Sequence, residues 1–222
     1  MDMAINSEIQ SHWEKVYSIK QPGEVSWYQP HLRGSLELIR RSGISLSDRI
    51  IDVGAGASTL VDDLIEAGFQ HLTVLDVSAN AIDVSRKRMG KRGDGIEWLT
   101  TDVLTADLPK NRFRLWHDRA LFHFLTNSDE RKRYIIQAAQ ALTADGFIVI
   151  ATFSEDGPQK CSGLDTCRYS ENGLTVEFGS DFRLIESFTE EHSKPAGGVQ
   201  SFRYFLFQRT IGEPVGSRFT KG

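Results

Sequence analysis

The chain is poor in cysteine, with only Cys161 and Cys167 among its 222 residues. Two thiols in a chain of this length do not make the disulfide framework that stabilises small secreted domains. Their C-x5-C spacing also differs from the spacings of zinc sites, and the sequence has no second pair. We therefore expect no metal site and a reducing compartment, the cytoplasm.

Long apolar runs and an excess of basic residues are also missing. No stretch approaches the roughly 20 apolar residues that a membrane span needs. The first residues, MDMAINSEIQSHWEKVY, lack the basic start and apolar centre of a signal peptide. The formal net charge is −4, whereas binding of DNA or RNA needs a concentrated basic face. We expect no membrane partner, and the charge argues against a nucleic-acid partner.

What the sequence does contain is an alternation of short apolar strands and amphipathic helices. Hydrophobic residues make up 40% of the chain and charged residues 25%, which are ordinary values for a globular domain. Periodicity and turn residues predict strands and helices in turn. This order predicts an α/β fold with a doubly wound, mostly parallel sheet. The expected strands are residues 49–54, 71–78, 96–102, 112–118 and 147–153, and the expected helices are residues 59–67, 79–89 and 128–143.

The two ends of the chain depart from this alternation. Residues 182–192 and 201–209 are strand-like runs without a helix between them, which predicts a β-hairpin at one side of the sheet. Before the first strand, an amphipathic segment follows a group of aromatic residues, Trp13, Tyr17, Trp27 and Tyr28. These residues predict either a helical cap over the carboxyl ends of the strands or a cluster that buries the back of the domain.

A glycine turn in the stretch DVGAGAS, residues 52–58, lies between the first strand and the first helix of the core. Open α/β sheets bind ligands at this point, because glycine allows a close approach and the helix offers unpaired N–H groups. The dinucleotide fingerprint GxGxxG is incomplete, since Thr59 stands at its third glycine. Asp52 would repel a pyrophosphate. Both features favour a ligand that has an ammonium group and no phosphate.

Further acidic residues stand at the ends of the next three strands. Asp76 lies twenty residues after Gly56 and is placed to accept both hydroxyl groups of a ribose. Asp102 follows the third strand, where it can accept from an adenine amino group. The fourth strand ends in His117-Asp118-Arg119. Together these positions predict a nucleoside site along one edge of the sheet.

In this order and spacing, the segments DVGAGAS, LDVS, TDVL and WHDRALFHFL resemble the successive motifs of class I S-adenosylmethionine-dependent methyltransferases. The resemblance covers residues 49–153, and small residues other than glycine often fill the position of Ser58. It implies a Rossmann-like seven-stranded sheet with an antiparallel C-terminal hairpin strand. It also implies one methyltransferase domain over residues 1–222, divided into a helical cap (1–48), a cofactor-binding core (49–153), a substrate-side loop with the hairpin (154–210) and a tail (211–222).

The resemblance also implies site residues, with S-adenosylmethionine as cofactor and S-adenosylhomocysteine as product. Asp118 would face both the methionine part of the cofactor and the incoming nucleophile. The other expected contacts are Asp52, Gly54, Ala55 and Gly56 for the methionine part, Asp76 and Val77 for the ribose, Asp102 and Val103 for the adenine, and Trp13, Trp27 and Tyr28 as residues closing over the cofactor.

Methyl transfer from a sulfonium is an in-line displacement with a good leaving group, so it depends mostly on alignment and exclusion of water. A general base is needed only when the nucleophile arrives protonated. His117 and His123 are candidates for that base, although a packed, hydrogen-bonded histidine is the favoured interpretation of His123. Arg119 would either bind an anionic substrate or pair with Asp118, and we favour the pair.

Two long polar loops add candidates for the substrate side. The loop after the fifth strand carries Cys161 and Cys167, and the hairpin connection carries His192 and Lys194. Loops of this length and polarity are typical of substrate-binding segments.

The sequence favours a small-molecule acceptor, because it shows no separate domain or basic surface for a macromolecule. A protein substrate is the alternative, since some relatives with a similar aromatic start methylate lysines. The NPPY tetrad of amino-methylating nucleic-acid enzymes is replaced by HDRA, residues 117–120. An NAD-dependent oxidoreductase is disfavoured by Thr59 and Asp52, and a non-catalytic nucleoside-binding protein has no positive sign in its favour.

Overall fold

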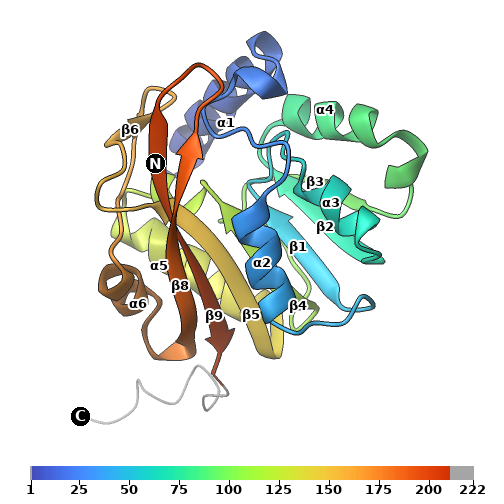
Figure 1. Cartoon of the computed structure of the whole chain (residues 1–222), viewed down its shortest axis with the longest axis vertical. Helices are drawn as coiled ribbons and strands as arrows, with labels where there is room; N and C mark the ends of the chain where they lie inside the picture. The colour runs from blue at the N-terminus through green and yellow to red at the C-terminus, as the bar shows by residue number, and fades with distance from the viewer. Residues whose placement is uncertain (1, 211–222) are drawn as a thin grey trace.

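A seven-stranded mixed sheet runs through the computed structural model, which describes residues 2–210 (Figure 1). The strand order is β3-β2-β1-β4-β5-β9-β8. The first five strands are parallel to one another, whereas β9 is antiparallel to both β5 and β8. The strands are β1 (Arg49–Val53), β2 (His71–Asp76), β3 (Glu97–Thr100), β4 (Phe113–Arg119), β5 (Leu142–Phe153), β8 (Phe182–Ser193) and β9 (Val199–Arg209).

This topology confirms the predicted fold class. The five parallel strands and the terminal hairpin overlap the expected segments, although β5 begins at Leu142, before the expected start at residue 147, and β9 inserts between β5 and β8. Six α-helices are described: α1 (Asp2–Ile19), α2 (Arg33–Arg41), α3 (Leu60–Glu66), α4 (Ala79–Met89), α5 (Ser128–Ala141) and α6 (Glu171–Phe178). The predicted tail, residues 211–222, lies outside the described residues.

The polar segment after β5 contains more regular structure than its sequence suggested. It forms a small two-stranded sheet of β6 (Lys160–Cys161) and β7 (Leu164–Asp165), and α6 follows. Ser170 caps α6 by accepting a hydrogen bond from the N–H of Gly173. The segment expected to be a loop is therefore folded onto the main sheet, where α6 contacts β8.

Both faces of the sheet are covered, because consecutive residues of a strand point to opposite faces. Ile50 of β1 packs with α2, α3 and α4, whereas Ile51 packs with α5 and α6. In β4, Leu115 packs on the same face as Ile50 and Trp116 on the same face as Ile51, and both are fully buried. In Figure 1, α2 lies in front of the sheet and α5 behind it. The parallel strands are thereby held in register.

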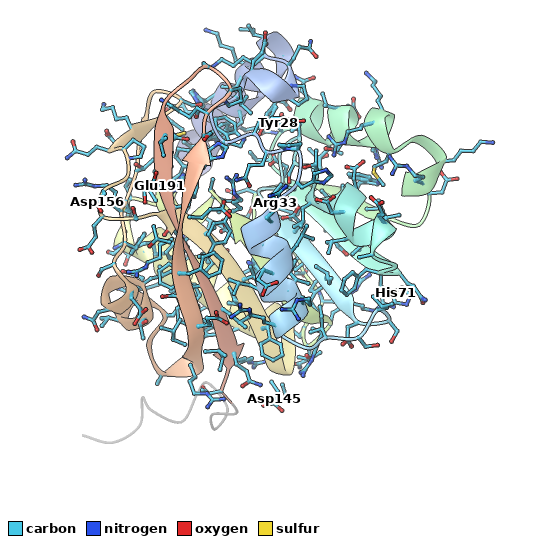
Figure 2. All side chains as sticks on the ribbon, in the orientation of Figure 1. Tyr28, Arg33, His71, Asp145, Asp156 and Glu191 are labelled. Carbon is cyan, nitrogen blue, oxygen red and sulfur yellow. The ribbon has the colours of Figure 1, made fainter. Side chains whose placement is uncertain are left out.

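The register brings the carboxyl ends of the strands to one edge. Asp52 of β1 is paired with His117 of β4, and Val53 is paired with Asp118. Figure 2 shows Tyr28 and Glu191 near this upper edge, whereas His71, at the start of β2, lies at the opposite edge. Within residues 2–210, no helix is long and apolar enough to cross a membrane.

Candidate active site

A cavity of about 370 Å³ opens where the carboxyl ends of the parallel strands meet the N-terminal segment. This volume lies within the range of small-molecule sites. Most residues expected from the sequence to bind a cofactor line it: Trp13, Trp27, Tyr28, Asp52, Gly54, Ala55, Asp76, Val77, Asp102 and Val103. The cavity combines apolar walls with a few charged groups, which is the usual composition of a specific ligand site.

The turn after β1 is formed by two glycines with left-handed backbone. Gly54 has φ of 60° and Gly56 has φ of 55°, which side chains with a Cβ rarely adopt. A Cβ on Gly54 would lie 2.2 Å from Cδ1 of Leu121, and one on Gly56 would lie 2.1 Å from the hydroxyl of Tyr17. Gly54 lines the cavity, whereas Gly56 lies behind it and supports the turn. Neither position has room for a side chain.

Asp76 anchors this turn from the neighbouring strand. Its Oδ2 accepts a hydrogen bond from the N–H of Gly56 at 2.7 Å, and its Oδ1 accepts one from the N–H of Ser78 at 2.8 Å. Burial raises the pKa of this carboxyl group to about 6, although both hydrogen bonds lower the pKa. Each oxygen retains a second lone pair, so the carboxylate can still accept two hydroxyl groups from a ligand.

Asp52 belongs to a buried chain of hydrogen bonds that reaches α2. The Nδ1–H of His117 donates to Oδ1 of Asp52 at 2.6 Å, and Nε2 of His117 lies 2.8 Å from the hydroxyl of Ser35. A neutral imidazole satisfies both contacts, because its second nitrogen then accepts from the serine hydroxyl. Asp52 and His117 line the cavity, but both nitrogens of His117 already have protein partners.

At the third strand end, Asp102 and Val103 line the same cavity beside Thr101. Oδ1 of Asp102 accepts a hydrogen bond from the N–H of Leu104 at 2.8 Å, which fixes the turn after β3. Among the described residues, no hydrogen-bond donor contacts its other oxygen, which suits a donor such as an exocyclic amino group. The three strand ends thus present Asp52, Asp76 and Asp102 in sequence across the sheet.

The position of Asp118 differs from the expectation that its side chain faces the cofactor and the nucleophile. It is fully buried and does not line the cavity. Oδ2 accepts a hydrogen bond from the hydroxyl of Tyr134 at 2.6 Å, and the carboxylate also accepts from the N–H groups of Leu121 and Phe122. Burial raises the pKa of Asp118 to about 6. Its geometry is that of an anchor for the loop after β4.

We expect Asp118→Ala to lower the free energy of unfolding by about 3 kcal/mol, because the substitution leaves the hydroxyl of Tyr134 and two backbone N–H groups without their acceptor. For a chain of this size, that loss corresponds to a decrease in Tm of roughly 10 °C. Circular dichroism during heating measures it. Asp118→Asn retains one acceptor oxygen and should lose less, and equal Tm values for Asp118→Ala and the parent would contradict the anchoring role.

His123 also differs from the expectation of a base beside the acceptor. Its ring is fully buried, stacks on Phe153 with 4.3 Å between the ring centroids, and does not line the cavity. Nδ1 accepts a hydrogen bond from the N–H of Phe153 at 3.3 Å. Burial lowers the pKa of His123 to about 3. The packed-histidine interpretation agrees with this placement, and a proton acceptor facing the substrate does not.

Arg119 lines the cavity but does not pair with Asp118, contrary to the preferred expectation. Its Nε donates to the hydroxyl of Tyr204 at 3.0 Å, and its Nη1 donates to the carbonyl of Trp27 at 2.8 Å. The guanidinium carbon lies 4.5 Å from the ring centroid of Phe202. Arg119 and Asp118 are sequence neighbours on a strand, so their side chains point to opposite faces of the sheet.

The N-terminal segment covers the cavity from above. Trp13 and Tyr17 of α1 line the cavity, and Trp13 makes edge contacts with Trp27 and Phe124 at centroid distances of 5.7 and 5.2 Å. The aromatic residues therefore lie over the carboxyl ends of the strands rather than at the back of the domain. The assignment of residues 1–48 to a helical cap stays a prediction.

Sequence reasoning missed the residue that attaches α1. The carboxylate of Glu14 accepts hydrogen bonds from the N–H groups of Ala79 and Asn80 and from the hydroxyl of Ser78, at the start of α4. An acidic side chain is favoured at a helix N-terminus. Glu14 lies one helical turn before Tyr17. It is one of many acidic residues in the chain, and its distance along the sequence from Tyr17 did not distinguish it from the others.

The polar loops contribute unequally. Cys161 lines the cavity and is buried, and its Sγ lies 3.9 Å from the hydroxyl of Ser26, whereas Cys167 lies outside the cavity. His192, expected from the sequence in the hairpin connection, lies near the end of β8, and its Nε2–H donates to the carbonyl of Ser26 at 2.7 Å. Among residues 2–210, no group of three histidine, cysteine or acidic side chains is placed to hold a metal ion.

Comparison with known proteins gives this arrangement a family context. Residues 50–146 match the family model described as a methyltransferase domain. The human EEF1A lysine methyltransferase 2 is 23% identical over 213 residues, covering 89% of this chain and 84% of the relative.

Among solved structures, the chain resembles one from work on conversion of a disulfide bond into a thioacetal group during echinomycin biosynthesis, with a TM-score of 0.74, 19% identity, and coverage of 92% of this chain and 94% of the other. It also resembles the Burkholderia thailandensis 1,6-didemethyltoxoflavin-N1-methyltransferase with bound 1,6-didemethyltoxoflavin and S-adenosylhomocysteine. That match has a TM-score of 0.67, 18% identity, and coverage of 94% and 88%.

Proposed function

Because this chain belongs to the class I S-adenosylmethionine-dependent methyltransferases, we propose that it transfers the methyl group to a small molecule that enters the capped cavity. Membership of this family argues against the two other functions considered, an NAD-dependent oxidoreductase and a non-catalytic nucleoside-binding protein. The observation that supports a small-molecule acceptor is the aromatic wall that Trp13, Trp27 and Phe124 form over the strand ends. Such a wall favours an acceptor small enough to fit against it in the cavity.

The cavity residues fit the cofactor in charge and shape. Asp76 would accept the ribose hydroxyl groups, assisted by Val77, and Asp102 with Val103 would hold the adenine. The backbone from Gly54 to Gly56 would hold the methionine part, with Asp52 balancing its ammonium group. The two left-handed glycines form a turn that a residue with a Cβ could not form without a clash with Leu121 or Tyr17. No phosphate-binding third glycine is needed, which agrees with Thr59.

The bound cofactor supplies an electrophilic methyl group on a positively charged sulfur. The protein's own contribution is then alignment and exclusion of water, for which the aromatic residues over the cavity are suited. With Asp52, Asp76 and Asp102 holding the cofactor, its methyl group would be presented for an in-line displacement by the acceptor. Because both nitrogens of His117 have partners, an acceptor that needs no proton removal by this residue is favoured.

A lysine side chain of a protein is the second candidate acceptor. The human EEF1A lysine methyltransferase 2 supports this alternative, because its similarity extends over 89% of the chain. The guanidinium of Arg119 in the cavity wall disfavours it, because a lysine would have to approach this positive charge.

Labelling with methyl-tritiated S-adenosylmethionine tests the acceptor class. The purified enzyme is incubated with whole cell lysate, and the products are separated by size. We expect label in the small-molecule fraction with the parent enzyme and a large loss of that label with Asp76→Ala. Label confined to protein bands, and dependent on Asp76, would replace the small-molecule proposal by a protein acceptor.

Trp27→Ala should raise the Kd for S-adenosylmethionine about tenfold, because it removes an aromatic side chain that closes the cavity and supports Trp13. Isothermal titration calorimetry measures the change. Trp98→Ala is the matched control, since Trp98 lies on β3 and is not among the residues that line the cavity. Equal affinities for Trp27→Ala and Trp98→Ala would assign Trp27 to packing alone.

A further inference from the structure

We propose that the methyl acceptor carries a negatively charged group, such as a carboxylate or another oxoanion, and that this group binds Arg119. This proposal rests on the small-molecule function proposed above and specifies the chemical class of its substrate. The acceptor would be an apolar molecule with one anionic group. Arg119 would bind and orient it, and the methyl group would still go to whichever acceptor atom faces the sulfur.

The guanidinium of Arg119 is fixed in position by three contacts, two from β9 and one from the N-terminal segment. Tyr204 of β9 accepts from Nε, the carbonyl of Trp27 accepts from Nη1, and Phe202 of β9 stacks against the flat face. A cation over an aromatic ring is stabilised by the electrons of the ring. The side chain is therefore preorganised and does not need to be ordered when a ligand binds.

One edge of this guanidinium is left without a partner. Nη2 is buried and, among the described residues, donates to no oxygen atom within hydrogen-bond distance, and the residue is only 8% exposed. Buried donors are nearly always satisfied, because an unpaired one costs the free energy of its lost hydration. Since Arg119 also lines the cavity, a ligand oxygen is the partner that would satisfy Nη2.

The positive charge is also incompletely neutralised. Within residues 2–210, no carboxylate forms an ion pair with Arg119. The acidic group nearest in the hydrogen-bond chain is Glu190, whose Oε1 contacts the hydroxyl of Tyr204 at 3.2 Å and the amide of Gln29 at 3.0 Å. Glu190 thus reaches Arg119 only through Tyr204. An anion in the cavity would complete the charge balance directly.

The strand order places Arg119 on the acceptor side. Of the expected cofactor residues, Asp52 lies in β1, Asp76 ends β2 and Asp102 comes just after β3, whereas Arg119 ends β4 on the other side of β1. Phe153 at the end of β5 and Cys161 continue the cavity wall in that direction. The part of the cavity beyond the methionine end of the cofactor therefore contains one cation among apolar and thiol side chains.

Fractionation of the cell's small molecules tests the charge of the acceptor. A low-molecular-mass ultrafiltrate of lysate is passed over an anion exchanger at pH 8, and the flow-through and the salt eluate are each incubated with enzyme and labelled S-adenosylmethionine. We expect methyl-accepting activity in the salt eluate. Activity only in the flow-through would overturn the anionic acceptor while leaving the small-molecule function intact, and label only in proteins would overturn both.

Variants of Arg119 test the contact itself. With the active eluate as acceptor source, Arg119→Met should raise the apparent KM for the acceptor about ten- to hundredfold, the usual effect of losing a hydrogen bond to a charged group. Arg119→Lys, which retains the charge but loses the planar fork, should give an intermediate value. Arg114→Met is the matched control, because Arg114 lies on the same strand, over Phe147, and outside the cavity.

Binding of S-adenosylhomocysteine by the same variants separates the acceptor role from two alternatives. We expect Arg119→Met and Arg119→Lys to retain the Kd of the parent for this product within about threefold. A much weaker Kd in a variant with unchanged Tm would assign Arg119 to the cofactor's own carboxylate. An unchanged KM for the acceptor in a folded Arg119→Met enzyme would assign Arg119 to holding Trp27, and either result would overturn the proposal.

Discussion

Asp76→Ala is expected to raise the Kd for S-adenosylmethionine by at least about a hundredfold. The carboxylate would accept both ribose hydroxyl groups, and a hydrogen bond to a charged group contributes about 1.5 to 3 kcal/mol. It also holds the N–H of Gly56 at 2.7 Å and that of Ser78 at 2.8 Å, so its removal releases the glycine turn as well. Calorimetric titration with S-adenosylmethionine and S-adenosylhomocysteine measures the loss.

The pH dependence of binding gives this prediction a second test. Because the pKa of Asp76 is raised to about 6 by burial, the unliganded carboxyl group takes up a proton as the pH falls through that value. A protonated carboxyl group accepts two hydroxyl groups less well than a carboxylate does. The affinity for S-adenosylmethionine should therefore decrease below about pH 6, and the decrease should approach tenfold per pH unit. The Asp76→Ala variant should lack this component, and an unchanged affinity from pH 7 to pH 5 in the parent would contradict the assignment.

Asp102→Asn provides a graded comparison on the next strand. It retains an acceptor for the N–H of Leu104, and only one expected contact to the adenine is weakened. The Kd should therefore rise by roughly tenfold or less. A larger effect from Asp102→Asn than from Asp76→Ala would place the principal anchor of the nucleoside at the adenine end instead of the ribose.

Of the substitutions that add a single methyl group to this chain, Gly54→Ala is expected to have the largest effect on stability and on cofactor binding. The left-handed backbone at φ of 60° disfavours alanine by about 1 to 2 kcal/mol. In addition, the new Cβ would lie 2.2 Å from Cδ1 and 2.6 Å from Cβ of Leu121. Cβ of Leu121 moves only with its backbone, and the N–H of Leu121 is held by Asp118. We expect a loss of about 3 kcal/mol in stability and at least a tenfold weaker cofactor Kd.

Gly43→Ala separates backbone strain from steric conflict. Gly43 has φ of 68°, and a Cβ placed on it would meet no atom within 4 Å. This variant should lose only the 1 to 2 kcal/mol of the left-handed backbone and retain its affinity for S-adenosylmethionine. Denaturant unfolding and calorimetry of the two variants side by side measure both effects. Equal losses would show that Leu121 moves aside without cost.

The positions of the parallel strands along the chain, and of the acidic residues at their ends, could be predicted from the sequence. Hydrophobic runs such as residues 49–53 and 71–76 leave few alternatives, and parallel strands necessarily bring their carboxyl ends to one edge. Asp52, Asp76 and Asp102 therefore fall beside the cavity as predicted. Their roles toward the cofactor remain predictions that the titrations above address.

The directions of side chains after β4 could not be read from the sequence. Asp118 turns toward Tyr134, sixteen residues later, and this contact depends on how α5 packs on the sheet. Ala120 adopts φ of 71°, which a non-glycine residue rarely does and which no motif signals. The turn that follows buries His123 beside Phe153 instead of exposing it to the cavity. Tertiary packing decided each of these outcomes.

Residues Ser26 and Trp27 are held by side chains from three separate parts of the chain. Arg119 of β4 binds the carbonyl of Trp27, His192 of β8 binds the carbonyl of Ser26, and Cys161 of β6 contacts the hydroxyl of Ser26. Grafting this N-terminal segment from another methyltransferase would consequently fail to transfer its selectivity unless all three partners were exchanged with it. To change the acceptor by engineering, these five positions should be exchanged together.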